Sequence, residues 1–132
     1  MAISVVVTVG DHVADALVEK LVPKIQALKV GAGTSCGLDM GPLVTGAARD
    51  KVKGYIDAGE AQGAKLVVDG RGLSVPGNEA GFFIGGTLFD HVTSEMSIYQ
   101  EEIFGPVLCI VRVNSLEEAM QLINDHEYGN GT

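Results

Sequence analysis

Residues 106–123, PVLCIVRVNSLEEAMQLI, decide the fold. The run 107–113 is almost entirely apolar or β-branched, which indicates a strand that is covered on both faces. Ser115 is followed three residues later by Glu118, a spacing that predicts a capping box at the start of a helix. That helix should have one apolar stripe, because apolar residues recur at helical spacing at Leu116, Ala119, Met120 and Ile123.

The beginning of the chain repeats this alternation of strand and helix. Residues 3–9, ISVVVTV, predict another buried strand. An amphipathic helix is expected over 12–29, with Asp11 able to cap it. Pro23 removes one backbone hydrogen bond inside that helix, so we expect a kink or a short break near Val22.

The middle of the chain is less regular. Residues 31–44 are rich in glycine and turn formers and should form an irregular loop. Thr45 is a candidate N-cap for a second helix that ends at Gly63. The stretch 64–70, AKLVVDG, predicts a short buried strand, and FFI at 82–84 predicts an edge strand.

Together these segments predict an α/β fold in a single domain over residues 1–132, with a mostly parallel sheet covered by helices. Hydrophobic residues make up 46% of the chain and charged residues only 20%, which favours an ordered core. The formal net charge is −8, and the half from residue 67 onward has two bases against ten acids. This acidic surface disfavours nucleic acid and anionic membranes as partners.

Most catalytic patterns are missing from the sequence, which has no CxxC, HExxH, GxSxG or Walker loop. The three histidines are scattered, so no metal site is predicted. Cys109 lies within an apolar run and is expected to be an inert core thiol. Cys36 has no neighbouring base to activate it, so we predict no catalytic residue in the chain. Two cysteines without an export signal favour a reducing compartment.

Residues 100–107, QEEIFGPV, place two acids and an aromatic residue directly before the strand at 107–113. One interpretation is that this segment contacts a ligand. The alternative is that Glu101 and Glu102 are solvated loop residues and that Phe104 belongs to the core.

The motif EEIFGPV resembles a signature of the aldehyde dehydrogenase superfamily, as do YGNGT at the end of the chain and GPLVT, GYIDAGEAQGAKLVVDG and GFFIGGTLFDHV upstream. The resemblance covers essentially the whole chain. The segments MAISV, ALVEKLVPKIQALKVGAGT and INDHEYGNGT are most similar to the coenzyme A-acylating methylmalonate-semialdehyde (malonate-semialdehyde) branch. Gly86 departs from the family pattern, which usually has proline at that position.

The resemblance implies that Glu102 binds the nicotinamide ribose of NAD and that Phe104 packs beside the nicotinamide ring. Glu101 is expected to form a structural salt bridge or to face water. The family's nucleophilic cysteine lies immediately before the segment that residues 1–4 resemble. The chain is therefore expected to be a partial catalytic domain, without the N-terminal NAD-binding domain and the C-terminal oligomerisation segment, and inactive alone.

The implied parent enzyme converts a small-molecule semialdehyde, with NAD and coenzyme A as co-substrate, into propionyl- or acetyl-CoA and carbon dioxide. An arginine that holds the substrate carboxylate is expected outside this segment. The family's habit also implies a homo-oligomer, in the cytoplasm of a bacterium or the mitochondrial matrix of a eukaryote. Two alternatives remain: a hydrolytic NAD-dependent aldehyde dehydrogenase, and a non-catalytic α/β interaction module derived from the same fold.

Overall fold

The computed structural model describes residues 3–129, so Met1, Ala2 and the last three residues of the YGNGT motif lie outside the described part. The described elements follow one another along the chain as β1 (Val5–Val9), α1 (Asp11–Gln26), α2 (Gly46–Ala61), β2 (Lys65–Val68), β3 (Thr87–Asp90), α3 (Ser97–Gln100), β4 (Val107–Val113) and α4 (Leu116–Asp125).

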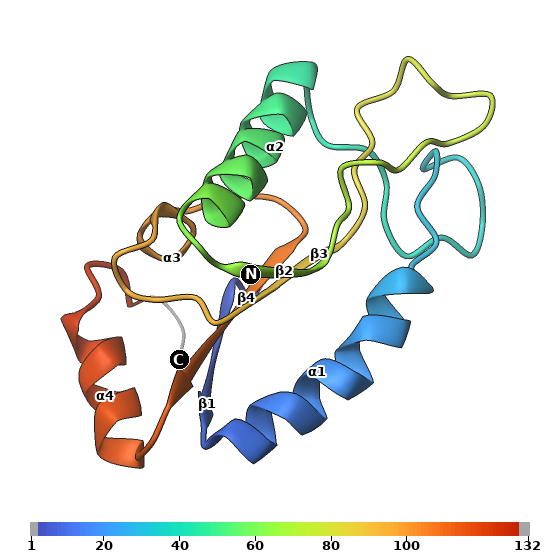
Figure 1. Ribbon diagram of the computed structural model, residues 1–132. Helices are drawn as coiled ribbons and strands as arrows, with labels where there is room; N and C mark the ends of the chain where they lie inside the picture. The colour runs from blue at the N-terminus through green and yellow to red at the C-terminus, as the bar shows by residue number, and fades with distance from the viewer. Residues whose placement is uncertain (1–2, 130–132) are drawn as a thin grey trace.

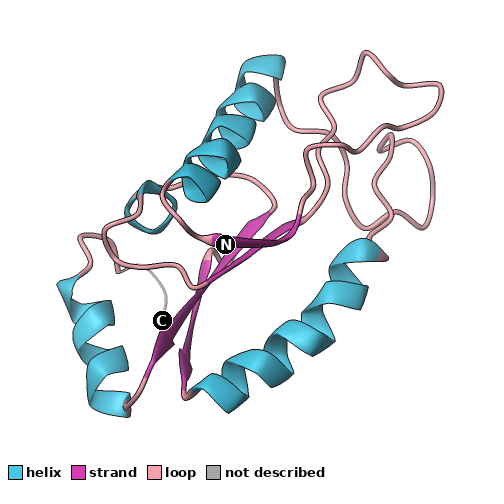
Figure 2. Ribbon diagram, in the orientation of Figure 1, coloured by secondary structure: helices cyan, strands magenta, loops and turns pink. Residues whose placement is uncertain are grey.

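The strands form one sheet in the order β1-β4-β3-β2. β4 pairs in parallel with both β1 and β3, whereas β2 runs antiparallel to β3 at the edge. Figure 1 shows α1 along one face of the sheet and α2, α3 and α4 on the other, and Figure 2 shows the same layers by element type. The predicted α/β fold with a mostly parallel, helix-covered sheet is confirmed.

Alternate residues of β4 serve the two faces. Cys109 and Val111 belong to a core with Val52 and Ile56 of α2. Ile110 lies between these two residues in the sequence, so its side chain points to the other face of the sheet, on the α1 side, where it is fully buried. This two-sided burial explains why the strand has a continuous apolar run.

Both ends of α2 follow the sequence prediction. The Thr45 hydroxyl accepts a hydrogen bond from the Ala48 amide at 3.0 Å, as an N-cap does. Gly63 follows the helix with a φ of 97°, a left-handed conformation that costs glycine little. The strand predicted just afterwards exists as β2, but it is an edge strand whose first residue, Lys65, is exposed.

The edge strand predicted at 82–84 is wrong. Phe83 and Ile84 are buried but lie in a loop, and the strand is β3, every residue of which is buried. Sequence patterning missed β3 because polar Thr87 and Asp90 bound it. Both polar side chains are satisfied inside the fold: the Thr87 hydroxyl accepts from the Gly70 amide at 3.0 Å, and Asp90 pairs with an arginine.

The predicted break near Val22 does not occur, because α1 continues through Pro23 to Gln26. Pro23 stands in the last turn, where its missing N–H costs one bond only and its own carbonyl accepts from the Ala27 amide at 3.1 Å. The predicted cap is also wrong: Gly10 occupies the N-cap position, and Asp11 lies in the first turn.

Of the two hydrogen bonds of the capping box predicted for α4, one is confirmed. The Ser115 hydroxyl accepts from the Glu118 amide at 3.2 Å, but the Glu118 carboxylate accepts from the Asn114 amide at 2.7 Å instead of the Ser115 amide. The predicted apolar stripe is wrong in part. Ala119 is buried, whereas the side chains of Leu116 and Met120 are mostly exposed.

Arg112 connects β4 to β3 and to α1. Its guanidinium forms two hydrogen bonds with the Asp90 carboxylate, at 2.9 and 2.7 Å, and further ion pairs with Asp11 and Asp15 of α1. The Asp90 side chain is only 1% exposed and that of Arg112 13%. Burial by itself raises the pKa of Asp90, but hydrogen bonds from Arg112 and from the His91 amide outweigh it, so the pKa is lowered overall.

Arg112→Met should lower the free energy of unfolding by about 3 kcal/mol at neutral pH, because Asp90 would remain buried without its partner. A group with a lowered pKa contributes stability above its ordinary value, near 3.8, and loses it as pH falls through the lowered pKa. The free energy of unfolding of variant and parent can be measured by chemical denaturation at several pH values. The difference between the two free energies should shrink below about pH 4.

Arg49→Met is the matched control, because Arg49 pairs with the exposed Asp50 at 3.0 Å. Such a surface pair contributes about 0–1 kcal/mol. Equal losses in the two variants would contradict the role given to the Asp90–Arg112 pair.

Candidate functional site

The loop 101–106 connects α3 to the amino end of β4 and contains the two predicted site residues. Glu102 is exposed, Ile103 is 5% exposed in the core, and the Phe104 side chain is 77% exposed. Ile103 thus anchors the loop while the two side chains beside it face outward. The interpretation of Phe104 as a core residue is wrong.

Phe104 combines two unfavourable features. Its φ of 58° lies in the left-handed region, which costs a residue other than glycine about 1–2 kcal/mol. Its large apolar ring is also left in water. Strained, exposed residues of this kind concentrate at ligand sites.

The two neighbouring glutamates have different roles. The Glu101 carboxylate accepts a hydrogen bond from the Tyr55 hydroxyl of α2 at 2.5 Å. The residue is exposed, so of the two expectations it faces water and forms no salt bridge among the described residues. This hydrogen bond, together with some burial and the Glu101 charge, raises the pKa of Tyr55. Among residues 3–129, no hydrogen bond or ion pair engages the Glu102 carboxylate, which is therefore available to a ligand.

Gly105 and Pro106 fix the other end of the loop. A Cβ atom at position 105 would lie 2.5 Å from Cγ2 of Val52 on α2, so only glycine lets the loop lie this close to the helix. The Pro106 carbonyl accepts from the Thr87 amide of β3 at 2.8 Å. The loop is held by α2 at one side and by the sheet at the other.

The amino end of β1 lies at the same edge of the sheet as this loop. β1 and β4 are parallel, with Val5 opposite Cys109, and the Ser4 carbonyl accepts from the Cys109 amide at 3.0 Å. Residues 3 and 4 therefore run beside the start of β4. Any group carried at the beginning of β1 and any ligand held by the loop share one edge.

A model of the "Aldehyde dehydrogenase family" matches residues 1–132. The chain belongs to this family. It is 80% identical, over its whole length, to malonate-semialdehyde dehydrogenase of Pseudomonas aeruginosa, of which it covers 27%. It is 42% identical to the methylmalonate-semialdehyde/malonate-semialdehyde dehydrogenase [acylating], mitochondrial, of Bos taurus, of which it covers 24%.

Solved structures of aldehyde dehydrogenases have the same fold. Methylmalonate-semialdehyde dehydrogenase from Oceanimonas doudoroffii superposes with a TM-score of 0.95 at 59% identity, over 98% of this chain and 26% of that one. The Mycobacterium tuberculosis aldehyde dehydrogenase complexed with NAD+ gives 0.84 at 36% identity, over 95% of this chain and 25% of that one. The chain spans about a quarter of the length of the relatives it matches.

The two thiols of this aldehyde dehydrogenase segment, Cys36 and Cys109, lie in different surroundings. Burial raises the pKa of Cys109 to about 12, and its Sγ lies 3.6 Å from the Ile98 carbonyl oxygen. It is the inert core thiol that the sequence predicted. Cys36 is exposed in the loop between α1 and α2, which Figure 1 shows on the opposite side of the molecule from α3.

Each of the three arginines is paired with one or more acids. Arg49 bonds Asp50, and Arg112 bonds Asp90. Arg71 pairs with acids of α2 and with one at the end of β2, namely Asp57, Glu60 and Asp69.

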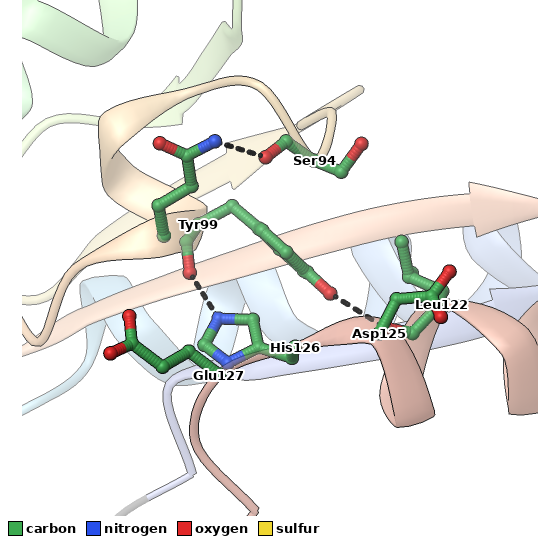
Figure 3. A pocket seen from close by; sticks show the side chains of 7 residues that line it. Ser94, Tyr99, Leu122, Asp125, His126 and Glu127 are labelled. Carbon is green, nitrogen blue, oxygen red and sulfur yellow. Dashed lines mark hydrogen bonds between the residues drawn. The ribbon is translucent and has the colours of Figure 1, made fainter.

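Sequence reasoning did not foresee a shallow hollow of about 360 Å³ between α3 and the end of α4, shown in Figure 3. His126 projects into it with both ring nitrogens engaged. Nδ1 lies 3.0 Å from the Tyr128 amide nitrogen and 3.2 Å from the Tyr128 carbonyl oxygen, and Nε2 lies 3.1 Å from the Tyr99 carbonyl oxygen. His126 thus ties the end of α4 to α3, and the described part of the chain contains no cluster of three or more potential metal ligands.

Within residues 3–129, none of the helices has the length and apolar character that a membrane crossing requires.

Gly105→Ala should lower the free energy of unfolding by about 2 kcal/mol, because the new methyl group must displace Val52 or the loop. Chemical denaturation of the chain measures this. Val52→Ala should lower the free energy of unfolding less in the Gly105→Ala variant than in the parent chain, because the smaller side chain makes room for the new methyl group.

Gly54→Ala, on the exposed side of the same helix, is the control. No atom lies within 4 Å of a Cβ there, so alanine should raise stability by about 0.5–1 kcal/mol. A loss at Gly54 as large as at Gly105 would exclude steric contact as the cause.

Proposed function

We propose that this chain is part of the catalytic domain of an NAD-dependent, coenzyme A-acylating dehydrogenase of malonate or methylmalonate semialdehyde. The observation that supports it most directly is that a Glu102 carboxylate without a partner among the described residues and an exposed Phe104 ring on a left-handed backbone stand on either side of a buried anchor, Ile103. The names and high identities of the relatives favour this substrate class. The Mycobacterium tuberculosis complex favours NAD.

The two side chains fit the two parts of a nicotinamide nucleoside. A carboxylate accepts charge-assisted hydrogen bonds from both hydroxyls of a ribose, which fixes the sugar. An apolar ring beside the sugar limits where the adjoining heterocycle can lie. NAD, when bound, supplies the acceptor for the hydride that leaves the aldehyde carbon.

The other residues of this segment bear on which groups of the whole enzyme attack the aldehyde and bind its carboxylate. The buried Cys109 cannot compete as a nucleophile, because its raised pKa keeps the thiol protonated. The paired arginines leave recognition of the substrate carboxylate to residues elsewhere in the whole enzyme. The attacking thiolate, which the family resemblance places just before the segment that residues 1–4 resemble, would enter at the amino end of β1, beside the loop 101–106.

A chimaera tests the proposal. Residues 1–132 replace the matching segment of the Pseudomonas aeruginosa malonate-semialdehyde dehydrogenase, to which they are 80% identical. We expect NADH to form from malonate semialdehyde and NAD, and acetyl-CoA to appear when coenzyme A is supplied, as followed by absorbance and mass spectrometry. Free acid as the main product with coenzyme A present would show that this segment does not support acyl transfer to coenzyme A and would favour the hydrolytic alternative. A folded but inactive chimaera would favour the non-catalytic module.

The 132-residue chain by itself provides the matched comparison. It should produce no NADH from the same mixture, because Cys109 is buried with a raised pKa and Cys36 lies in the loop between α1 and α2, on the opposite side of the molecule from α3. Aldehyde oxidation by the chain alone would contradict the assignment of the nucleophile to a residue outside it.

Glu102→Gln in the chimaera should raise KM for NAD about tenfold and slow a single turnover, because a neutral amide accepts weaker hydrogen bonds than a carboxylate does. Steady-state and stopped-flow measurements of NADH formation give both numbers. Glu117→Gln, on the exposed first turn of α4, removes the same charge away from the loop and should change neither. Similar kinetics in the two variants would remove Glu102 from the cofactor site.

A further inference from the structure

Three residues of the segment 101–105 are anchored, and they alternate with the two that are free. Glu101 is bonded to Tyr55, Ile103 is buried in the core, and Gly105 packs against Val52. The residues between them, Glu102 and Phe104, are the exposed pair.

Two of these anchors come from one face of α2. Val52 and Tyr55 are three residues apart, so they lie next to each other on the helix surface. Val52 is buried and packs closely against the loop, because Gly105 has no side chain in the way. Tyr55 packs its ring against the core and extends its hydroxyl to Glu101.

The Tyr55 ring is itself held in place from the same helix. The ammonium group of Lys51, one turn earlier, lies 5.4 Å from the ring centroid, within the range of a cation–π contact. The hydroxyl therefore projects from a ring with limited freedom. Its bond to an ionised carboxylate is charge-assisted and short.

Without this bond, the loop would present two adjacent carboxylates with similar surroundings. Glu101 and Glu102 are both exposed, so burial fixes the position of neither of them. The Tyr55 bond engages one of them and leaves the other.

We propose that Tyr55 is a positioning residue for the cofactor loop: by binding the Glu101 carboxylate, it leaves Glu102 as the acid that meets the ribose and holds Glu102 in its outward orientation. This inference rests on the proposed function. The role of Tyr55 is indirect, because its hydroxyl contacts Glu101 and not the ligand.

The test is Tyr55→Phe in the chimaera described above, which removes one hydroxyl and keeps the ring. We expect KM for NAD to rise about fivefold to tenfold, since the loop then spends less time in the binding orientation. KM for the semialdehyde should stay the same, and the melting temperature should change little because the lost bond is exposed.

Tyr99→Phe is the matched control. Its hydroxyl donates to the Leu122 carbonyl at 3.2 Å and belongs to the packing of α3 on α4. Removing it should lower the melting temperature and leave KM for NAD unchanged. The two tyrosine variants therefore predict opposite patterns, and a purely structural role for Tyr55 would give the Tyr99 pattern.

Dependence on Glu101 is tested by a double-mutant cycle. Glu101→Ala should raise KM for NAD by a similar factor, and Tyr55→Phe should add nothing in that background because the partner is already lost. Glu101→Gln, which can still accept from the tyrosine hydroxyl, should restore part of the affinity. Additive effects of the two changes would overturn the proposal.

Hydrogen–deuterium exchange separates this inference from the proposed function. In the folded chimaera, active or not, Tyr55→Phe should speed exchange of the amides of 101–105, and Tyr99→Phe should not. An NAD-dependent chimaera with unchanged KM and unchanged exchange in Tyr55→Phe would refute the positioning role alone. A chimaera that does not use NAD would refute the proposed function, and unchanged exchange would then refute the anchoring as well.

Discussion

The parallel pairing of β4 with β1 and β3 is the constraint on which the other features depend. Because β4 is buried on both faces, its direction and register determine what stands at its two ends. Its amino end receives the loop that carries Glu102 and Phe104. Its carboxyl end carries Arg112, which binds Asp90 of β3 and the first turns of α1. One strand therefore fixes both the candidate site and the contact that closes the opposite edge.

The sequence predicted those parts of the fold whose burial is purely apolar or whose ends are capped by side chains. The runs that form β1 and β4 and the Thr45 cap are of this kind. It failed at β3, where polar Thr87 and Asp90 are buried because partners distant in sequence satisfy them. A local pattern cannot show that Arg112 will neutralise an aspartate 22 residues away, so β3 looked unlike a core strand.

The candidate site shows the same division. Resemblance to a family pointed to Glu102 and Phe104, and the solvated position of Glu102 could be expected from its charge. The left-handed backbone of Phe104 and the bond between Tyr55 and Glu101, 46 residues apart, could not, because both depend on how α2 packs against the loop. The steric need for glycine at position 105 also becomes visible only in the fold, because it comes from the Val52 side chain of α2.

An exposed ring in a left-handed conformation persists only where neighbouring contacts over-determine the backbone. The contacts that hold the backbone of the loop 101–106 differ in kind. The burial of Ile103 and the fit of Gly105 to Val52 are apolar, insensitive to salt, and close to Phe104 on both sides. The contact at Glu101 is polar and exposed, and it lies farther from the strained residue. The apolar anchors are therefore sufficient to hold the Phe104 ring outward, and the polar one bears on the orientation of the acids. Under the proposed function, steric placement of the heterocycle and recognition of the sugar rest on separate contacts of one short loop.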